Sequence, residues 1–311
     1  MIKQELNGMS KKEQLVARAK DKLYNFILAD GQIRGAILHG TLMVNEMRQN
    51  HVLGVLETLV LGHAYLGVTL MTSNLKKDDR IAFKIECAGP IKGLSVEASA
   101  RGEVRGYLKN NPIPLDTPLD SFDLSPFFGT GYLEVTHFPD YAKQPYTGRV
   151  KLEYGRLAAD LANYYLTSEQ TPTSFNLSVK FDTAGNVTGA GGLILQVLPN
   201  AAQDITEQLE SLVQNLPSIG EAFETGLEPD VFITTYFHDF SPKMLGSGRV
   251  EFFCPCRKET VGNVIAQLPM ETLDDMVQND PFPIETTCHN CNTIYSFAKE
   301  EIESFRRQKH G

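Results

Sequence analysis

The chain has 311 residues, of which 42% are hydrophobic and 22% charged, and its formal net charge is −9. That length suits one sizeable core and a smaller second domain, while the negative charge argues against a nucleic-acid-binding protein, which needs a basic face. The opening residues lack the apolar segment of a signal peptide and no run approaches 18 apolar residues, so we expect a cytoplasmic protein that makes no membrane contact.

Residues 1–199 are predicted to form one α+β core domain. Apolar segments on both sides of Asp30-Gly31 indicate a β-hairpin. The stretch Val52–Leu70 has apolar residues at helical spacing and predicts a buried or half-buried helix. Strands that neighbour one another in sequence favour a mainly antiparallel sheet with packed helices. The other predicted elements are strands at 80–87, 94–100, 131–138 and 147–153, a helix at 156–167 and a hairpin around 183–186.

Residues 200–250 are predicted to be an acidic helical linker. Between Phe181 and Pro242 there are nine Asp or Glu residues and no Lys or Arg. Apolar residues recur at helical spacing from 205 to 216, and Asp204 with Glu207 predicts an N-cap and an acidic first turn. The pattern is compatible with an ordinary solvated connector. It is equally compatible with a marginal helix whose apolar stripe needs a neighbour for stability.

Residues 251–311 are predicted to be a small metal-binding domain. Short helices are expected at 261–268 and 270–278, and a last helix at 298–308. Tyr295 and Phe297 are the expected apolar core. Because so short a segment buries little apolar surface, a bound metal would supply much of its folding free energy.

Four of the five cysteines lie in this small domain. Cys254 and Cys256 form a C-x-C pair, Cys288 and Cys291 form a C-x-x-C pair, and 31 residues separate the two pairs. Two such pairs, brought together in space, make a tetrahedral four-thiolate site suited to one Zn²⁺ per chain. The same pairs are also placed to close two small disulfides. The sequence therefore predicts a metal site that is either permanently structural or lost on oxidation.

Three other candidates are expected to have ordinary structural roles. Cys87 lies in a strand pattern and is expected to be a small buried core residue. His289, between the second pair of cysteines, is expected to be a solvated loop residue rather than a substitute ligand. The segment Arg101–Gly106 looks basic, but we expect a strand and a turn there.

Together, the cysteine pairs and several short core motifs resemble the 33-kDa heat-shock family of redox-regulated holdase chaperones, over almost the full length of the chain. Both pairs match those of the family, with a similar separation. Each core motif is weak alone, but the combination, in the family's order, is specific. These motifs are Gly89-Pro90, Ser168–Pro172, Ala190–Gly192 and Leu198-Pro199.

This resemblance implies an ATP-independent chaperone and not an enzyme. The reduced, zinc-bound form would be an inactive or weakly active monomer. Peroxide with heat, or hypochlorite, would form the disulfides Cys254–Cys256 and Cys288–Cys291, with loss of zinc and unfolding of the linker, roughly residues 200–250. The exposed apolar surface would then bind unfolded or partly folded client proteins. The resemblance further implies a homodimer when oxidised and transfer of clients to ATP-dependent chaperones.

Two features depart from the family pattern. After the first cysteine pair the family usually has Ser, a basic residue, an acidic residue and Arg, whereas this chain has Arg257-Lys-Glu-Thr260. Arg257 adds positive charge near the thiolates, which is expected to alter how readily they oxidise. A short N-terminal stretch before about Lys12 is also atypical. Neither feature is expected to touch the metal ligands.

Two alternative functions also fit the cysteine pattern. A zinc-ribbon binding protein, acting in translation or transcription, would use the four cysteines only for structure. A thiol oxidoreductase would use Cys288 and Cys291, but the chain contains no Trp, and the surroundings usual for a thioredoxin-like C-x-x-C are missing. Reversible zinc loss on peroxide treatment favours the chaperone, and zinc that resists peroxide favours the ribbon.

Overall fold

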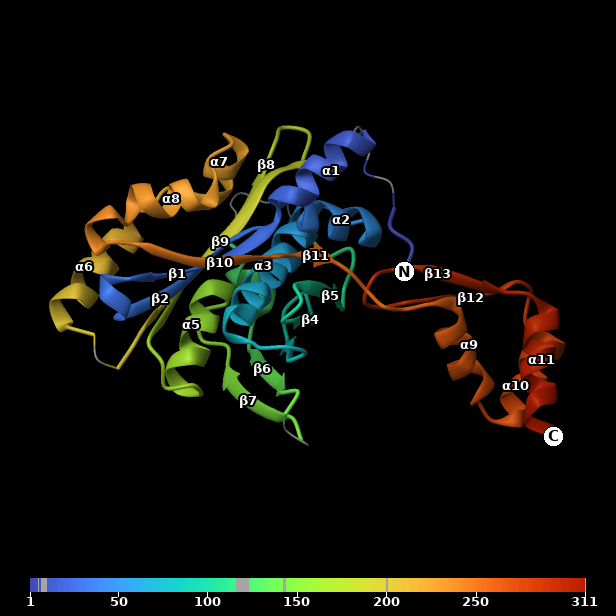
Figure 1. Ribbon diagram of the computed structural model, residues 1–311. Coiled ribbons are helices and arrows are strands. Elements are labelled where there is room, and N and C mark those ends of the chain that lie inside the picture. Colours follow the sequence, from blue (N-terminus) through green and yellow to red (C-terminus); the bar gives the residue numbers. More distant parts are fainter. Residues whose placement is uncertain (5, 7–9, 116–122, 142–143, 200, 311) are drawn as a thin grey trace.

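Two β-sheets with a long helix between them form the body of the molecule, and a smaller unit projects from one side (Figure 1). The computed structural model describes all residues except 5, 7–9, 116–122, 142–143, 200 and 311. Within this part of the chain the expected α+β class is confirmed. The ladders are antiparallel except for one short parallel pair.

The first sheet has five strands in the order β10-β1-β2-β9-β8. The predicted hairpin around Asp30 is confirmed, with a short 3₁₀ turn, η1 (Ala29–Gly31), in which Asp30 has a φ of 51°. The hairpin expected around 183–186 is confirmed as well, and it joins β8 to β9. The strands are β1 (Lys22–Leu28), β2 (Ile33–His39), β8 (Thr173–Phe181), β9 (Val187–Val197) and β10 (Lys243–Arg249).

The second sheet has six strands in the order β11-β5-β4-β3-β6-β7. All four strands predicted between residues 80 and 153 belong to it. The parallel pair is β11 with β5, in which Glu251 lies opposite Glu103. The bounds of the elements are β3 (Arg80–Cys87), β4 (Gly93–Ser99), β5 (Glu103–Leu108), α4 (Ser125–Phe128), β6 (Gly131–Phe138), β7 (Tyr146–Lys151) and β11 (Glu251–Phe252).

Helix α3 (Val55–Met71) packs between the two sheets and is the centre of the core. The predicted helix over 52–70 was wrong at its start, because Val52 has a φ of 54° and terminates a separate helix, α2 (Thr41–His51). The stretch Val55–Asn74, which includes the 3₁₀ turn η2 (Thr72–Asn74), is long and apolar enough to cross a membrane, but 89% of its apolar window is buried inside the fold. The remaining core helices are α1 (Lys11–Lys20) and α5 (Leu157–Thr167).

The segment between β9 and β10 covers the other face of the five-stranded sheet (Figure 1). Its helices are α6 (Gln203–Gln214), α7 (Ile219–Glu224), α8 (Pro229–Tyr236) and the short 3₁₀ turn η3 (His238–Phe240). The N-cap of α6 is Ala202, not Asp204 as expected, and Asp204 lies in the first turn. The end of the predicted helical linker also differs, because Lys243–Arg249 pairs with β1 as strand β10.

The projecting unit carries the cysteines, and we call residues 254–310 the cysteine module. Its helices match the three expected ones within a few residues. Tyr295 and Phe297 lie in its apolar cluster, together with Ile265, Leu273, Val277 and Ile302. Its elements are α9 (Lys258–Ala266), α10 (Met270–Asn279), β12 (Ile284–Thr287), β13 (Ile294–Phe297) and α11 (Lys299–His310).

Candidate metal centre and redox site

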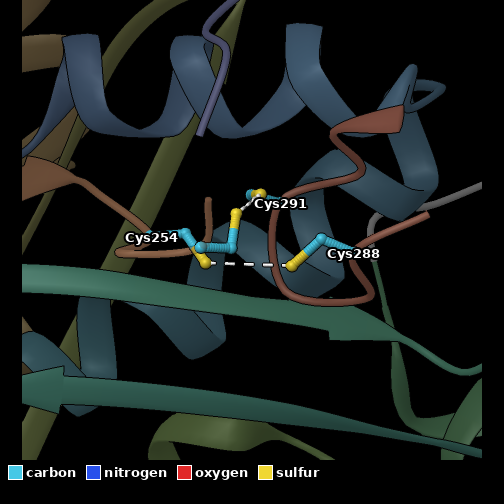
Figure 2. A group of neighbouring side chains, drawn as sticks. Cys254, Cys288 and Cys291 are labelled. Carbon is cyan, nitrogen blue, oxygen red and sulfur yellow. Dashed lines mark hydrogen bonds between the residues drawn. The ribbon is translucent and has the colours of Figure 1, made fainter. Parts of the chain in front are cut away.

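The structure brings all four predicted cysteines together. Their sulfur atoms lie within 4.8 Å of one another. Cys254 Sγ is 3.9 Å from Cys288 Sγ (Figure 2), and Cys256 Sγ is 3.3 Å from Cys291 Sγ. Cys254 and Cys291 are buried, and the other two are half-buried.

Two loops deliver the sulfurs to this point. Cys254 and Cys256 lie between β11 and α9, and Cys288 and Cys291 lie in the turn between β12 and β13. That turn is tight, because Cys288 O accepts hydrogen bonds from Cys291 N at 3.3 Å and Asn292 N at 2.7 Å. Asn292 adopts a left-handed conformation with a φ of 54°, which suits Asn. The C-x-x-C spacing thus directs both sulfurs of the pair to the same side.

The donor set fits a metal ion. A tetrahedral Zn²⁺ with Zn–S bonds of about 2.3 Å places its sulfurs roughly 3.8 Å apart, within the range seen in this cluster. Four soft thiolates also suit Zn²⁺ better than Mg²⁺ or Ca²⁺, which prefer oxygen. The cluster can therefore hold a metal ion, with Cys254, Cys256, Cys288 and Cys291 as the ligands.

Hydrogen-bond donors and one cation surround the sulfurs. Arg105 Nη1 lies 3.9 Å from Cys254 Sγ, and the Tyr295 hydroxyl donates to Cys256 Sγ at 3.2 Å. Hydrogen bonds from the thiols of Cys288 and then Cys291 lower the pKa of Cys254. The bond with Cys254 in turn raises the pKa of Cys288 to about 11. The site therefore favours negative charge on Cys254, the sulfur that the guanidinium faces.

The cation beside the sulfurs comes from an unexpected place. From the sequence we expected Arg257 to place positive charge near the thiolates. Its side chain is exposed, and in the described part of the structure it makes no contact with a cysteine sulfur. Arg105 lies on β5, where a strand was correctly expected, but its role at the site was not anticipated. Glu97 on β4 pairs with Arg105 at 2.6 Å and helps to fix its direction.

The site lies at the junction of the cysteine module and the core. Asn50 Nδ2, from α2, donates to Cys291 O at 2.9 Å, and Asn292 Nδ2 donates to Asn50 O at 3.0 Å. From the sheet side, Gly106 N donates to Asn290 O at 3.3 Å. Any loosening of the cysteine turn therefore breaks contacts with both α2 and β5.

Neither His289 nor Cys87 belongs to the group of four clustered ligands. His289 is exposed as expected, and its ring is 5.6 Å from the ring of Tyr107. Cys87, at the end of β3, is half-buried rather than fully buried, and this burial raises the pKa of its thiol. The expectation that the N-terminal stretch avoids the ligands was wrong, because Met1 N donates to Cys256 O at 2.7 Å.

Comparison with known proteins assigns this arrangement to a family. The family model described as "Hsp33 protein" matches residues 21–298. The chain belongs to the Hsp33 family. A curated "33 kDa chaperonin" of Desulforamulus reducens is 33% identical over 285 residues, covering 91% of this chain and 96% of that protein. Another, from Lachnoclostridium phytofermentans, is 34% identical over 285 residues, covering 91% and 97%.

The fold agrees with this assignment. The crystal structure of the 33 kDa chaperonin (heat shock protein 33 homologue) of Thermotoga maritima matches with a TM-score of 0.85 and 31% identity, covering 94% of this chain and 99% of that one. The family resemblance stated from the sequence is thereby confirmed. As a member of the Hsp33 family, the chain is a chaperone. Its cysteine cluster is compatible with zinc and with a redox-active centre.

Proposed function

We propose that this chain is an ATP-independent holdase chaperone switched on by oxidation of its four clustered cysteines. The observation that carries the proposal is the position of the cluster, between the cysteine module and the core, on the chain segment that continues from β10 and β11. Chemistry at the sulfurs can therefore act on elements outside the module.

In the reduced form, Cys254, Cys256, Cys288 and Cys291 would hold one Zn²⁺, which keeps the four sulfurs deprotonated near neutral pH. The module needs this support, because its apolar cluster contains only six buried residues within the described part of the chain. Metal binding contributes roughly 10–16 kcal/mol to the folding of small zinc domains, more than a cluster of this size provides.

Oxidation would convert the two pairs into the disulfides Cys254–Cys256 and Cys288–Cys291. In each pair the two sulfurs form one bond and give up two electrons. With hydrogen peroxide as the oxidant, two thiols and one peroxide yield one disulfide and two molecules of water. A disulfide sulfur is no longer a thiolate ligand, so the module would lose its metal-dependent stability.

The consequence would reach the apolar face of the five-stranded sheet. The helices α6–α8 cover that face and continue directly into β10, which is exposed along its whole length and leads to β11 and Cys254. Unfolding of the module would release β11, then β10, and then one end of the covering segment. The uncovered side chains include Phe26, Ile37 and Leu193, which would bind apolar segments of client proteins.

The same proposal includes features inferred from the family resemblance. The active form would be a homodimer, clients would pass to ATP-dependent chaperones, and the protein would work in the cytoplasm, where thiols are kept reduced until oxidative stress. On this account the protein has no catalytic residues. Residues 1–199, 200–250 and 251–311 would act as client-binding core, metastable linker and redox switch.

The test is light scattering from a client protein that unfolds on heating. The full chain is added either reduced and zinc-loaded or oxidised beforehand with peroxide at elevated temperature. Suppression by the oxidised form alone is the expected result, and a Cys87→Ser control should respond like the wild type. Failure of both forms would contradict the chaperone assignment. Equal suppression by both would keep the holdase and reject the switch, leaving the cysteines as a structural site.

A further inference from the structure

The N-terminal segment, Met1–Gln4, lies across the junction between the cysteine module and α2. Figure 1 shows the N-terminus beside β13, where the projecting unit meets the body of the molecule. The family match begins only at residue 21, so these residues lie outside it. Their contacts are therefore a feature of this chain that the family assignment does not explain.

On the module side, the segment contacts both cysteine loops. Ile2 N donates to Thr293 Oγ1 at 3.1 Å, and the Thr293 hydroxyl lies 3.3 Å from Ile2 O. Thr293 also lies 3.2 Å from Cys291 Sγ. From the first loop, Cys254 N donates to Met1 Sδ at 3.2 Å. One short peptide thus joins the loop of the C-x-C pair to the turn of the C-x-x-C pair.

On the core side, the segment is held by α2. Asn50 Nδ2 donates to Ile2 O at 3.0 Å, and Asn50 Oδ1 accepts from Gln4 N at 2.9 Å. Lys3 forms an ion pair with Glu46, one turn earlier on the same face of α2. Glu46 is only 5% exposed, and this burial raises the pKa of its carboxyl. The positive charges of Lys3 and Arg18 act in the opposite direction and lower that pKa. If Lys3 were removed, the buried Glu46 carboxylate would keep an ion pair with Arg18, whose Nη2 lies 3.5 Å from Glu46 Oε1. It would lose its pairing with Lys3, and a buried charge that loses a partner is destabilising.

We propose that Met1–Gln4 is an intramolecular latch that holds the cysteine module against the core and so sets how easily the four cysteines are oxidised. Asn50 is central to it, because the same side-chain amide binds Ile2 O and Cys291 O. With the latch closed, opening of the cysteine turn requires loss of contacts on α2, on the segment and on Thr293 together. The effect of the latch on cysteine oxidation rests on the proposed redox function. The contacts that close the latch do not depend on that function.

The test compares the zinc-loaded wild type with three variants. The first lacks residues 2–9 and retains Ser10, whose capping box with Glu13 begins α1. The second is Lys3→Met, which removes the cation but keeps an apolar stem. The third, Lys11→Met, is the matched control, because it removes an exposed lysine from the same end of the chain. The readout is amide hydrogen exchange in residues 284–297, followed by the rate of zinc release on addition of peroxide.

The net free energy of one hydrogen bond changes the equilibrium constant for local opening by roughly fivefold. Because the latch contains several such bonds, its complete loss should speed exchange in residues 284–297 by about tenfold or more. Lys3→Met should speed it by about threefold or more, as expected for a partly buried ion pair, and Lys11→Met should not change it. Zinc release should follow the same order. If the truncated chain fails to fold, the difference in exchange rate between Lys3→Met and Lys11→Met is sufficient to test the latch.

Exchange at the wild-type rate in both the truncated chain and Lys3→Met would overturn the latch. The proposed redox function fails in a different way. If zinc in the wild type resists peroxide while the variants exchange faster, the latch stands as a structural clamp and the redox switch is rejected.

Discussion

Helix α3 and the segment α6–α8 cover opposite faces of the same five-stranded sheet, but they are held very differently. Almost all of the 17 residues of α3 are buried between the two sheets, whereas Leu209 is the one buried residue among the 12 of α6. A helix with an apolar stripe and little other burial depends on the surface beneath it. The comparison shows that α3 is enclosed by the core, whereas α6 is held mainly by one apolar stripe, as the proposed release of the cover α6–α8 requires.

The two regions also differ in what they are connected to. The Tyr65 hydroxyl of α3 donates to Gly106 O in the second sheet at 3.0 Å, so α3 joins the two sheets directly. The segment α6–α8 instead continues into β10, β11 and Cys254. On the proposed function, oxidation of the cysteines acts on α6–α8 through this chain connection, and the predictions below probe the module, the cover, the core and the junction in turn.

The largest effect is expected from removing metal ligands. In the double variant Cys288→Ser, Cys291→Ser, the module should lose its bound zinc and unfold, because thiolate coordination supplies roughly 10–16 kcal/mol in such domains. Zinc content and circular dichroism measure the result. The part of the melting curve that reports the core should stay close to the wild type. Full zinc content in the double variant would show that these residues are not the ligands.

The second prediction compares a variant on each face of the five-stranded sheet. Phe232 in α8 is fully buried in the cluster under the cover, and Phe232→Ala should weaken docking of the cover by about 3–5 kcal/mol. This variant should suppress client aggregation without an oxidant. The matched variant Leu66→Ala, in α3, should cost a similar free energy of unfolding.

Leu66→Ala should not create oxidant-independent activity, because it weakens the core and not the cover. Light scattering with the reduced, zinc-loaded variants makes the comparison. Constitutive activity in Leu66→Ala but not in Phe232→Ala would reverse the roles assigned to the two faces.

Acid is expected to weaken the junction through His51. Burial lowers the pKa of His51 from about 6.5 to about 4, so between these values the unfolded chain binds a proton that the folded chain does not. Its stabilising contribution is complete above about pH 6.5 and is lost as the pH falls toward about 4, by roughly 2–3 kcal/mol.

Urea unfolding of the wild type and of His51→Gln at neutral and acidic pH measures this contribution. Acid also protonates metal-binding thiolates in both proteins, so the informative quantity is the difference between them. The wild type should lose more stability than the variant on acidification. Equal losses would show that His51 does not report on the junction.

The smallest effect concerns the guanidinium beside Cys254. Arg105→Gln removes the cation that lies 3.9 Å from the sulfur, and we expect metal affinity to fall roughly tenfold, as for other groups that support metal ligands. Competition with a chelator measures the affinity. Arg101→Gln is the control, since Arg101 is exposed and pairs with Asp78 instead. The same loss of affinity in both variants would mean that only overall charge matters.

Much of the fold could be predicted because its signals are local. Ile81, Phe83 and Ile85 alternate with polar residues, and they lie buried on one face of β3. The close spacing within each cysteine pair was enough to predict the cluster that the structure contains. The start of α3 was missed because Val52 ends α2 in a left-handed conformation, where Gly or Asn is usual.

What could not be predicted depends on contacts between distant parts of the chain. Lys243–Arg249 has two glycines and no buried residue, so it becomes a strand only through pairing with β1. Arg105 reaches Cys254 because the register of β11 on β5 places them together. The contact of Met1 with Cys254 joins residues 253 positions apart, and no local pattern signals it.

The most direct test of the account is amide hydrogen exchange of the full chain before and after peroxide treatment at elevated temperature, comparing residues 203–240 with α3. We predict that oxidation removes protection from the module and from residues 203–240, while α3 stays protected. Retained protection of residues 203–240 after both disulfides have formed would contradict the account, because the cysteines would then not control the cover.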